Sequence, residues 1–251
     1  SSHKIKYFNI GDVGLPKSFN FALKKAKNEY ILITQPDVTF EKDSIQKLIE
    51  ATKRYKNFGL LAPVIYENKQ YSIFNTLDLP LGKNGELVEG KKTKKIKNVI
   101  PSGDFCVEAV SATAMLLRKS VLMKIGGWDE NIYTYLEDLD LCIKLRRSKY
   151  QLIKIESSII DHIGFGSHKN ENVIKSELSR NWHFVWSSLY FRQKYSSNKN
   201  FIKFLIHNFI KYFLKTILFA IGLNKKKTIL NFIRIRDSLN YIFIKKKNYI
   251  I

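Results

Sequence analysis

Residues 29–34, with the sequence Glu-Tyr-Ile-Leu-Ile-Thr, form a short apolar run rich in β-branched side chains. The run ends at the turn sequence Gln-Pro-Asp of residues 35–37. Such a pattern is typical of a buried parallel strand that ends in a turn. Helical apolar spacing precedes it at 19–27 and follows it at 45–52, and a further strand pattern occupies 59–66. The alternation predicts an α/β sheet with parallel neighbours.

The rest of the chain divides into a continuation of this sheet and an appendage. Residues 67–99 are polar and lack a sustained period, which predicts a functional or locally disordered loop. Strand patterns return within 106–117, and helices are expected over 119–125 and from about Leu136. A chain of 251 residues suits one large domain plus an appendage. We place the large domain at 1–195 and a basic helical extension at 196–251.

The extension contains an apolar helix pattern over 201–221 that resembles a membrane span. Lys203, His207, Lys211 and Lys215 recur in it every four residues. On a helix this spacing forms one drifting polar stripe. Lysines inside a span would each cost roughly 2.5–3.5 kcal/mol on insertion scales, whereas a helix lying in the interface keeps them in water. We therefore expect a peripheral, membrane-associated helix, with packing on the large domain or on another subunit as the alternative.

The formal net charge of +21 is open to three interpretations: an anionic membrane surface, nucleic acid, or compositional bias. Only 8 of the 43 basic residues are Arg, the residue that bidentate recognition of phosphate and guanine relies on. We therefore expect no nucleic-acid partner. Cys106 and Cys142 are far apart, so neither a disulfide framework nor a zinc site is indicated. The first residues do not resemble a signal peptide, and we expect a cytoplasmic location.

Asp37 is the first candidate for chemistry. It follows the predicted strand 29–34, and open α/β sheets bind ligands at the carboxyl ends of their strands. There a carboxylate can help a divalent cation to hold a nucleotide diphosphate. The alternative is ordinary turn chemistry, in which Asp is common.

Glu137 and Asp138 are the second candidates. Acids in the first turn of a helix are favoured by the helix dipole and can be simple caps. A transferase, however, needs a carboxylate to take a proton from the attacking hydroxyl group. The preceding loop, which contains Trp128 and Asp129, could close on a sugar. The two acids point about 100° apart on a helix, so only one could face the acceptor.

His162 is the third candidate, at the end of an apolar run and before a glycine-spaced segment. A histidine there can bind a metal through one ring nitrogen while the other is fixed by a neighbouring group. A lone histidine in a loop is more often structural.

Read in order from about Asn9 to Tyr195, these segments resemble family 2 glycosyltransferases. The similarity is to the rhamnosyltransferase-like branch, which acts on bacterial surface polysaccharides. The blocks that carry it are Ile31-Leu-Ile-Thr-Gln-Pro-Asp-Val, Val110-Ser-Ala-Thr-Ala-Met-Leu-Leu-Arg, Gly126-Gly-Trp-Asp-Glu, Leu136-Glu-Asp-Leu-Asp-Leu-Cys, His162-Ile-Gly-Phe-Gly-Ser and Arg180-Asn-Trp-His-Phe.

The resemblance implies a GT-A fold, a mixed sheet flanked by helices, and an inverting glycosyltransferase. It implies that Asp138 is the general base, helped by Glu137, and that Gln35 and Asp37 contact the donor. Trp128 and Asp129 would contact the acceptor. Asp37 and His162 would hold Mg²⁺ or Mn²⁺.

The implied donor is a dTDP- or UDP-linked sugar, with rhamnose a candidate, and the implied acceptor is a glycan or a lipid-linked sugar. The expected location is peripheral, on the cytoplasmic face of the inner membrane.

The chain departs from the family pattern at three places, and two of them, Gln35 and the missing first strand, keep a second hypothesis open. Gln35 stands at the first acidic or Asn position of the donor motif, and Ala112 stands where the family usually has Gly. The family's first strand, and the base-binding Asp after its second strand, have no counterpart before Ser1. The alternative is a degenerate, non-catalytic family member that acts as a membrane-bound partner of an active enzyme. The donor sugar, the acceptor and the linkage are not encoded in any pattern that we recognise.

Overall fold

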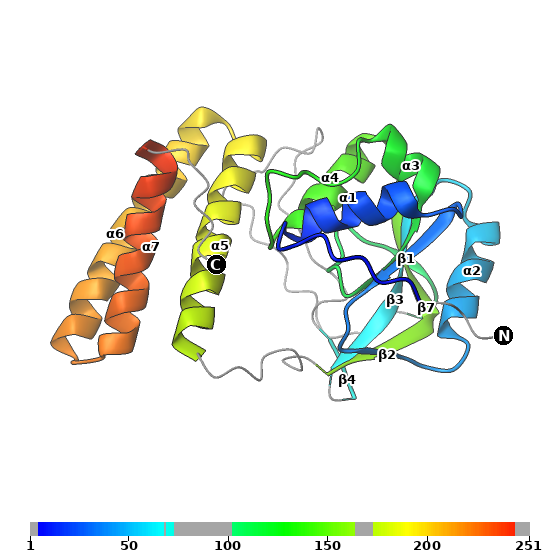
Figure 1. Cartoon of the computed structure of the whole chain (residues 1–251), viewed down its shortest axis with the longest axis horizontal. Helices are drawn as coiled ribbons and strands as arrows, with labels where there is room; N and C mark the ends of the chain where they lie inside the picture. Colours follow the sequence, from blue (N-terminus) through cyan, green and yellow to red (C-terminus); the bar gives the residue numbers. More distant parts are fainter. Residues whose placement is uncertain (1–4, 68, 73–101, 164–172, 244–251) are drawn as a thin grey trace.

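A computed structural model describes residues 5–67, 69–72, 102–163 and 173–243. A mixed sheet packs between helices, and a group of long helices extends from it (Figure 1). The sheet order is β1-β6-β3-β7-β2, with β4 on β3 and β5 on β7. The strands are β1 Tyr30–Thr34, β2 Val38–Phe40, β3 Phe58–Glu67, β4 Gln70–Tyr71, β5 Phe105–Cys106, β6 Ala114–Arg118 and β7 Gln151–His162. The predicted α/β sheet flanked by helices is confirmed.

Helices cover both faces of this sheet. On one face α1, α3 and α4 share a core with β3, β6 and β7, around Leu60, Leu117 and Leu141. On the other face α2 packs Leu48 and Ala51 against the same strands. The helices are α1 Leu15–Lys25, α2 Ser44–Arg54, α3 Lys119–Lys124, α4 Glu137–Arg147, α5 Val173–Tyr195, α6 Asn198–Ile221 and α7 Lys225–Phe243.

The expectation of parallel neighbours for the strand at 29–34 is wrong. β1 pairs with β6, antiparallel, over its whole length, and among the described strands only β3 and β7 run parallel. Its apolar side chains are half-buried and both of its end residues are exposed. The apolar run therefore predicts that a strand forms here. The direction of its neighbour depends on tertiary packing, which the run does not encode.

Other boundaries shift for local reasons. α1 begins four residues before the predicted start, because Pro16 at the first turn suits a helix N-terminus. The strand expected from Cys106 ends at that residue, and Ala109 and Val110 are buried in the core without strand pairing. Most of the loop predicted at 67–99 lies outside the described residues, apart from the short β4.

The long helices carry the C-terminal part away from the sheet (Figure 1). α5 joins the two parts: Phe191 and Tyr195 pack on Ile143 of α4, whereas Trp182 and Trp186 pack in a cluster with Tyr241 of α7. α6 lies along α7, and none of its residues is buried. The boundary that we predict between Tyr195 and residue 196 falls at the turn between α5 and α6 and stays a prediction.

Candidate active site

The first turn of α4 places Glu137 and Asp138 beside the sheet. Tyr135 and Leu136 both adopt a left-handed backbone with φ of 66°, which turns the chain sharply into the helix. Leu136 at the N-cap has no side chain able to cap, and no cap hydrogen bond forms. Glu137 is buried, and its Oε2 has no hydrogen-bond partner among the described residues. Capping alone therefore does not explain why a carboxylate oxygen without a partner is buried here.

Asp138 is tied to both the helix and the sheet region. Its Oδ1 accepts a hydrogen bond from the backbone N–H of Leu139 at 2.8 Å, and its Oδ2 accepts one from Ala112 at 3.1 Å. The neighbouring carbonyl of Thr113 accepts the N–H of Gln35 at 3.1 Å. Residues 112 and 113 therefore bridge Asp138 to the carboxyl end of β1, where the predicted donor contacts lie.

The acidic pair has perturbed protonation. Burial, followed by the neighbouring Asp138 charge, raises the pKa of Glu137 to about 7. Burial also raises the pKa of Asp138, opposed by the hydrogen bonds from Leu139 and Ala112. A general base works best when its pKa lies near the operating pH, and pairs of acids with raised pKa values gather at functional sites. The half-buried Asp138 is suited to accept a proton.

Asp37 and His162 lie together at the same sheet edge. β2 follows Asp37 at once and pairs antiparallel with the end of β7, so that Val38 faces His162 in register. Nε2 of His162 lies 3.6 Å from Oδ1 of Asp37. Its other ring nitrogen, Nδ1, lies 3.2 Å from Oε1 of Glu67 at the end of β3. The structure thus brings together the two residues predicted as metal ligands.

Glu67 was missed by the sequence reasoning. It stands at the junction between a strand and a polar loop, and no motif marked it. The parallel pairing of β3 with β7 carries its carboxylate to His162. A carboxylate on the second nitrogen of a histidine is the usual arrangement around a metal-binding imidazole. Among the residues that the structure describes, no group of three or more His, Cys, Asp or Glu side chains could hold a metal by itself.

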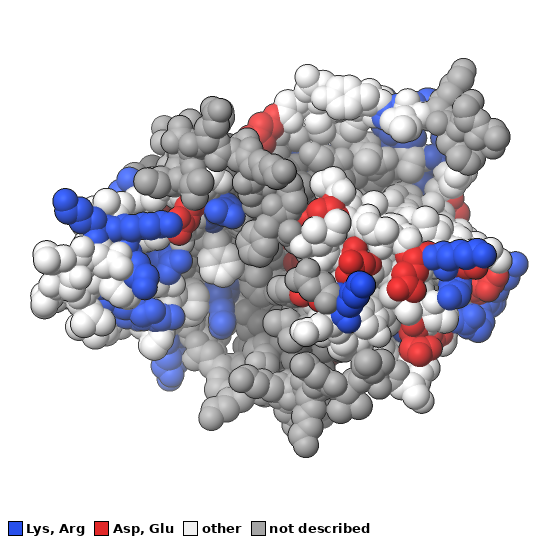
Figure 2. All heavy atoms as spheres, turned by 90° about the horizontal axis from the view of Figure 1, so that it is seen from below, with Lys and Arg blue, Asp and Glu red and all other residues white. Residues whose placement is uncertain are grey.

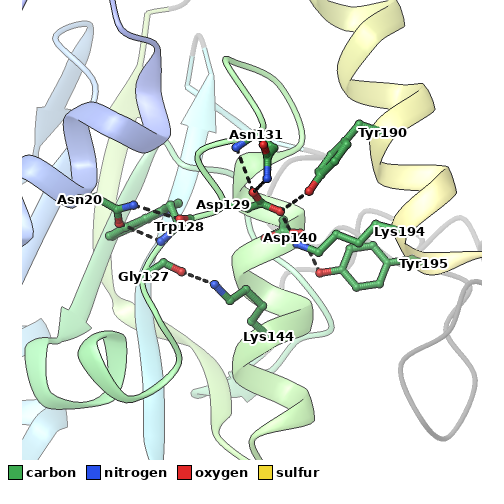
Figure 3. Close-up of polar contacts among 10 residues, drawn as sticks. All are labelled: Asn20, Gly127, Trp128, Asp129, Asn131, Asp140, Lys144, Tyr190, Lys194 and Tyr195. Atoms are coloured by element: carbon green, nitrogen blue, oxygen red, sulfur yellow. Dashed lines mark hydrogen bonds and ion pairs between the residues drawn. The ribbon is translucent and has the colours of Figure 1, made fainter. Parts of the chain in front are cut away.

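The Gly126–Glu130 loop is held in place by hydrogen bonds to a side chain of α1. The Asn20 side chain accepts the N–H of Trp128 at 2.9 Å and donates to its carbonyl at 3.0 Å (Figure 3). Gly127, with φ of 62°, has its Cα so close to Asn20 that a Cβ would come within 2.4 Å of the amide oxygen. The Trp128 ring is only 4% exposed and packs on Phe19. The structure therefore places this ring in the core, and its contact with an acceptor stays a prediction.

Asp129 takes part in a partly buried polar bridge with α5. Its Oδ2 accepts from the Tyr190 hydroxyl at 2.8 Å and from Lys194 Nζ at 2.7 Å (Figure 3). Lys194 also donates to Asp140, which is 1% exposed and accepts a further hydrogen bond from Tyr195 at 2.7 Å. We call these five residues the Lys194 bridge. It joins the loop, α4 and α5, and it engages the Asp129 carboxylate that the sequence predicted as an acceptor contact.

The Lys194 bridge makes the free energy of unfolding depend on pH. Burial alone would raise the pKa of Asp129, but hydrogen bonds from Lys194, Asn131 and Tyr190 lower it from 3.8 to about 2. A carboxylate with a lowered pKa stabilises the fold above its unfolded pKa and loses this contribution as the pH falls through the folded one. The Asp129 side chain is only 13% exposed, and its lowered pKa contributes about 2 kcal/mol to the free energy of unfolding. We expect urea unfolding to show this loss between about pH 4 and pH 2, with a shallower slope in Asp129→Asn; equal slopes would contradict it.

The C-terminal helices expose apolar and basic groups together. Within the described part of the chain, α6 is the one helix long and apolar enough to cross a membrane, judged by length and composition, with a mean hydropathy of 1.4. Its outward apolar residues are Ile202, Ile206, Phe209, Ile210, Phe213, Leu214, Ile217, Leu218 and Ile221. Figure 2 shows Lys and Arg side chains gathered over the helical part at the left. Asp and Glu lie mainly on the sheet-bearing part at the right, beside further basic residues.

Comparison with known proteins identifies the family that the chain resembles. The family model described as Glycosyl transferase family 2 matches residues 1–125. Rhamnosyltransferase WbbL of Escherichia coli (strain K12) is 26% identical over 210 residues, which cover 78% of this chain and 77% of that protein. An N-acetylglucosaminyl-diphospho-decaprenol L-rhamnosyltransferase of Mycobacterium tuberculosis is 24% identical over 54% of this chain and 47% of its own length.

Two solved structures resemble the fold at a TM-score of 0.47 each. One is GalNAc-T7 with UDP, GalNAc and Mn²⁺, at 11% identity over 78% of this chain and 44% of that one. The other is the mannosyltransferase PcManGT of Pyrobaculum calidifontis with GDP-Man and Mn²⁺, at 12% identity over 93% and 68%.

Proposed function

Because this chain belongs to the family 2 glycosyltransferases, in their rhamnosyltransferase-like branch, we propose that it transfers one sugar from a nucleotide diphosphate to a lipid-linked acceptor and inverts the anomeric carbon. One observation carries the proposal. Asp138, a half-buried carboxylate with a raised pKa, is joined through Ala112 and Thr113 to the strand end that bears Gln35 and Asp37. Rhamnose is the sugar that we propose, since the curated relatives are named for its transfer.

The proposed reaction is a single displacement. The acceptor hydroxyl oxygen attacks the anomeric carbon while the bond from that carbon to the diphosphate oxygen breaks on the opposite face. Asp138 takes the hydroxyl proton, and the bonding electrons leave with the nucleoside diphosphate. The transition state has oxocarbenium character, as in glycoside hydrolysis. The pKa of Glu137 is about 7. When Glu137 is protonated it is neutral, so no second negative charge lies beside the Asp138 carboxylate.

Asp37 and His162 fit a divalent cation. They supply one carboxylate oxygen and one imidazole nitrogen, and the contact with Glu67 fixes the histidine ring. A cation such as Mg²⁺ is typically held by one or two protein groups together with substrate phosphate oxygens. Bound there, Mg²⁺ or Mn²⁺ would neutralise charge on the departing diphosphate. The small number of protein ligands therefore favours a cation that arrives with the donor.

A membrane surface is the proposed location. From Phe201 onward the chain carries 11 Lys or Arg residues against a single acid, Asp237. Each basic residue near an anionic leaflet adds about 1 kcal/mol of attraction. The exposed apolar side of α6 supplies the buried area that such a helix needs. We propose peripheral binding at the cytoplasmic face of the inner membrane, where a lipid-linked acceptor would be reached.

An assay with a donor panel tests this function. The full chain is incubated with dTDP-rhamnose, UDP-sugars and GDP-mannose, and with N-acetylglucosaminyl-diphospho-decaprenol as acceptor. We expect transfer from dTDP-rhamnose, an anomeric configuration opposite to the donor's by NMR, and loss of turnover with EDTA that Mn²⁺ or Mg²⁺ restores. A product that retains the donor's configuration would contradict inversion. No transfer and no donor hydrolysis with any sugar would favour the non-catalytic partner.

A further inference from the structure

A cavity of about 340 Å³ lies where α4, α5, α6 and α7 meet, and the mechanism above does not use it. Its wall is mostly carbon, so a ligand that fills it would be apolar over most of its surface. The apolar wall includes Leu136, Leu139, Phe184, Leu189, Phe191 and Phe204.

The cavity adjoins the turn that carries the proposed base. Leu136 and Leu139, two of its lining residues, stand on either side of Glu137 and Asp138 in the sequence. Leu136 is the N-cap residue of α4. A ligand in the cavity would therefore contact the same turn of α4 that carries Asp138.

The wall also carries a positive group. Arg192 lines the cavity, and its guanidinium carbon lies 4.7 Å from the centre of the Phe204 ring. A guanidinium is well suited to phosphate oxygens, since it presents several donors in a fixed plane. A molecule with an apolar chain joined to a phosphate group matches a carbon-lined cavity with Arg192 in its wall.

One wall of the cavity is formed by α6, a helix that is apolar on its exposed side as well. Phe204, Asn208 and Tyr212 of α6 line it, while residues such as Ile206, Phe213 and Ile217 of the same helix are exposed. The volume lies near the lower end of that of ligand pockets, which suits the start of a long chain rather than the whole of it.

We propose that this cavity binds the first isoprenoid units of a lipid-linked acceptor, next to its diphosphate. The inference rests on the proposed function, which supplies the acceptor class. The cavity would hold the chain in the orientation that brings the attached sugar to Asp138. Binding there would lower KM for long-chain acceptors, whereas acceptors with a short alkyl chain would not benefit.

Ser188 gives a direct test because it lines the cavity from α5. Ser188→Phe fills the space, and Ser188→Ala is the matched control that leaves it open. With N-acetylglucosaminyl-diphospho-decaprenol we expect the first variant to raise KM about tenfold, or about 1.4 kcal/mol. The kcat/KM for the same sugar diphosphate with a short alkyl chain should remain unchanged. Calorimetric binding of farnesyl diphosphate should weaken about tenfold as well.

The possible results distinguish a failure of the cavity assignment from a failure of the proposed function. Equal kinetic losses with both acceptors, or farnesyl diphosphate binding that Ser188→Phe leaves unchanged, would overturn the cavity assignment while leaving the enzyme intact. If Ser188→Phe weakens the binding of phosphatidylglycerol as much as that of farnesyl diphosphate, the cavity binds membrane lipid in general. That result would also overturn the assignment to the acceptor chain. A wild type without transferase activity would overturn the proposed function, and farnesyl diphosphate binding would still decide the cavity. If Ser188→Phe fails to fold, Asn208→Phe and Asn208→Ala repeat the comparison from α6.

Discussion

Replacing Asp138 by Asn is expected to lower kcat for sugar transfer roughly 100- to 10,000-fold, the usual contribution of general base catalysis. Asn keeps the shape of the side chain but cannot accept the hydroxyl proton. The substitution gives up one of the two backbone hydrogen bonds that Asp138 accepts. It also removes a carboxylate whose burial raises its pKa, and that relief offsets the lost bond. The melting temperature and the affinity for the nucleoside diphosphate should therefore change little.

Asp43→Asn is the matched control for this substitution. Asp43 is an exposed residue at the start of α2, a helix that packs on the sheet face opposite α4. We expect its turnover to equal that of the wild type. Steady-state kinetics with saturating donor and acceptor measure both variants. Turnover in Asp138→Asn within a few-fold of the wild type would exclude Asp138 as the base.

Replacing Lys194 by Met is expected to destabilise the protein by about 3 kcal/mol, the lower end for a broken buried ion pair. The side chain of Lys194 is 28% exposed, which keeps the loss at that end. Met fills much of the same space but leaves Asp129 and Asp140 without their shared cation. The free energy of unfolding from urea titration at pH 7 measures the effect.

The pH dependence of this loss identifies its cause. If charge is responsible, the difference from the wild type should shrink as the pH falls from about 4 towards 2, the range over which Asp129 becomes protonated. Lys199→Met, at an exposed position in α6, is the matched control and should change stability by less than about 0.5 kcal/mol. A loss that stays constant from pH 7 to pH 3 would assign it to packing instead.

Much of the fold could be predicted from the sequence because the strands and helices are locally marked. The runs before Asp37 and over β3, and the helix that starts after Leu136, appear where the apolar periods place them. The mixed sheet also agrees with the GT-A class that the resemblance implied. Strand direction could not be predicted, since the pairing of β1 with β6 depends on residues far apart in the sequence.

The site was predictable where a family block carried it and not elsewhere. The blocks named Asp37, Asp138 and His162, and the structure brings Asp37 and His162 within 3.6 Å of each other. Glu67 lies outside every block, because its role depends on where β3 ends beside β7. Lys194 and Tyr190 were missed for the same reason: a lysine and a tyrosine on a polar helix end give no signal until α5 is docked. The catalytic roles assigned to Asp138 and Glu137 remain predictions until the variants are assayed.

The Lys194 bridge has a consequence for synthesis on the ribosome. The sheet and α4 leave the ribosome before α5, so Asp140 is at first without its paired cation. The N-terminal part of the chain is therefore expected to remain loosely folded until Lys194 has left the exit tunnel. Emergence of Tyr195 from the tunnel would then close the carboxylate pair and complete this part of the fold, before the basic helices have emerged.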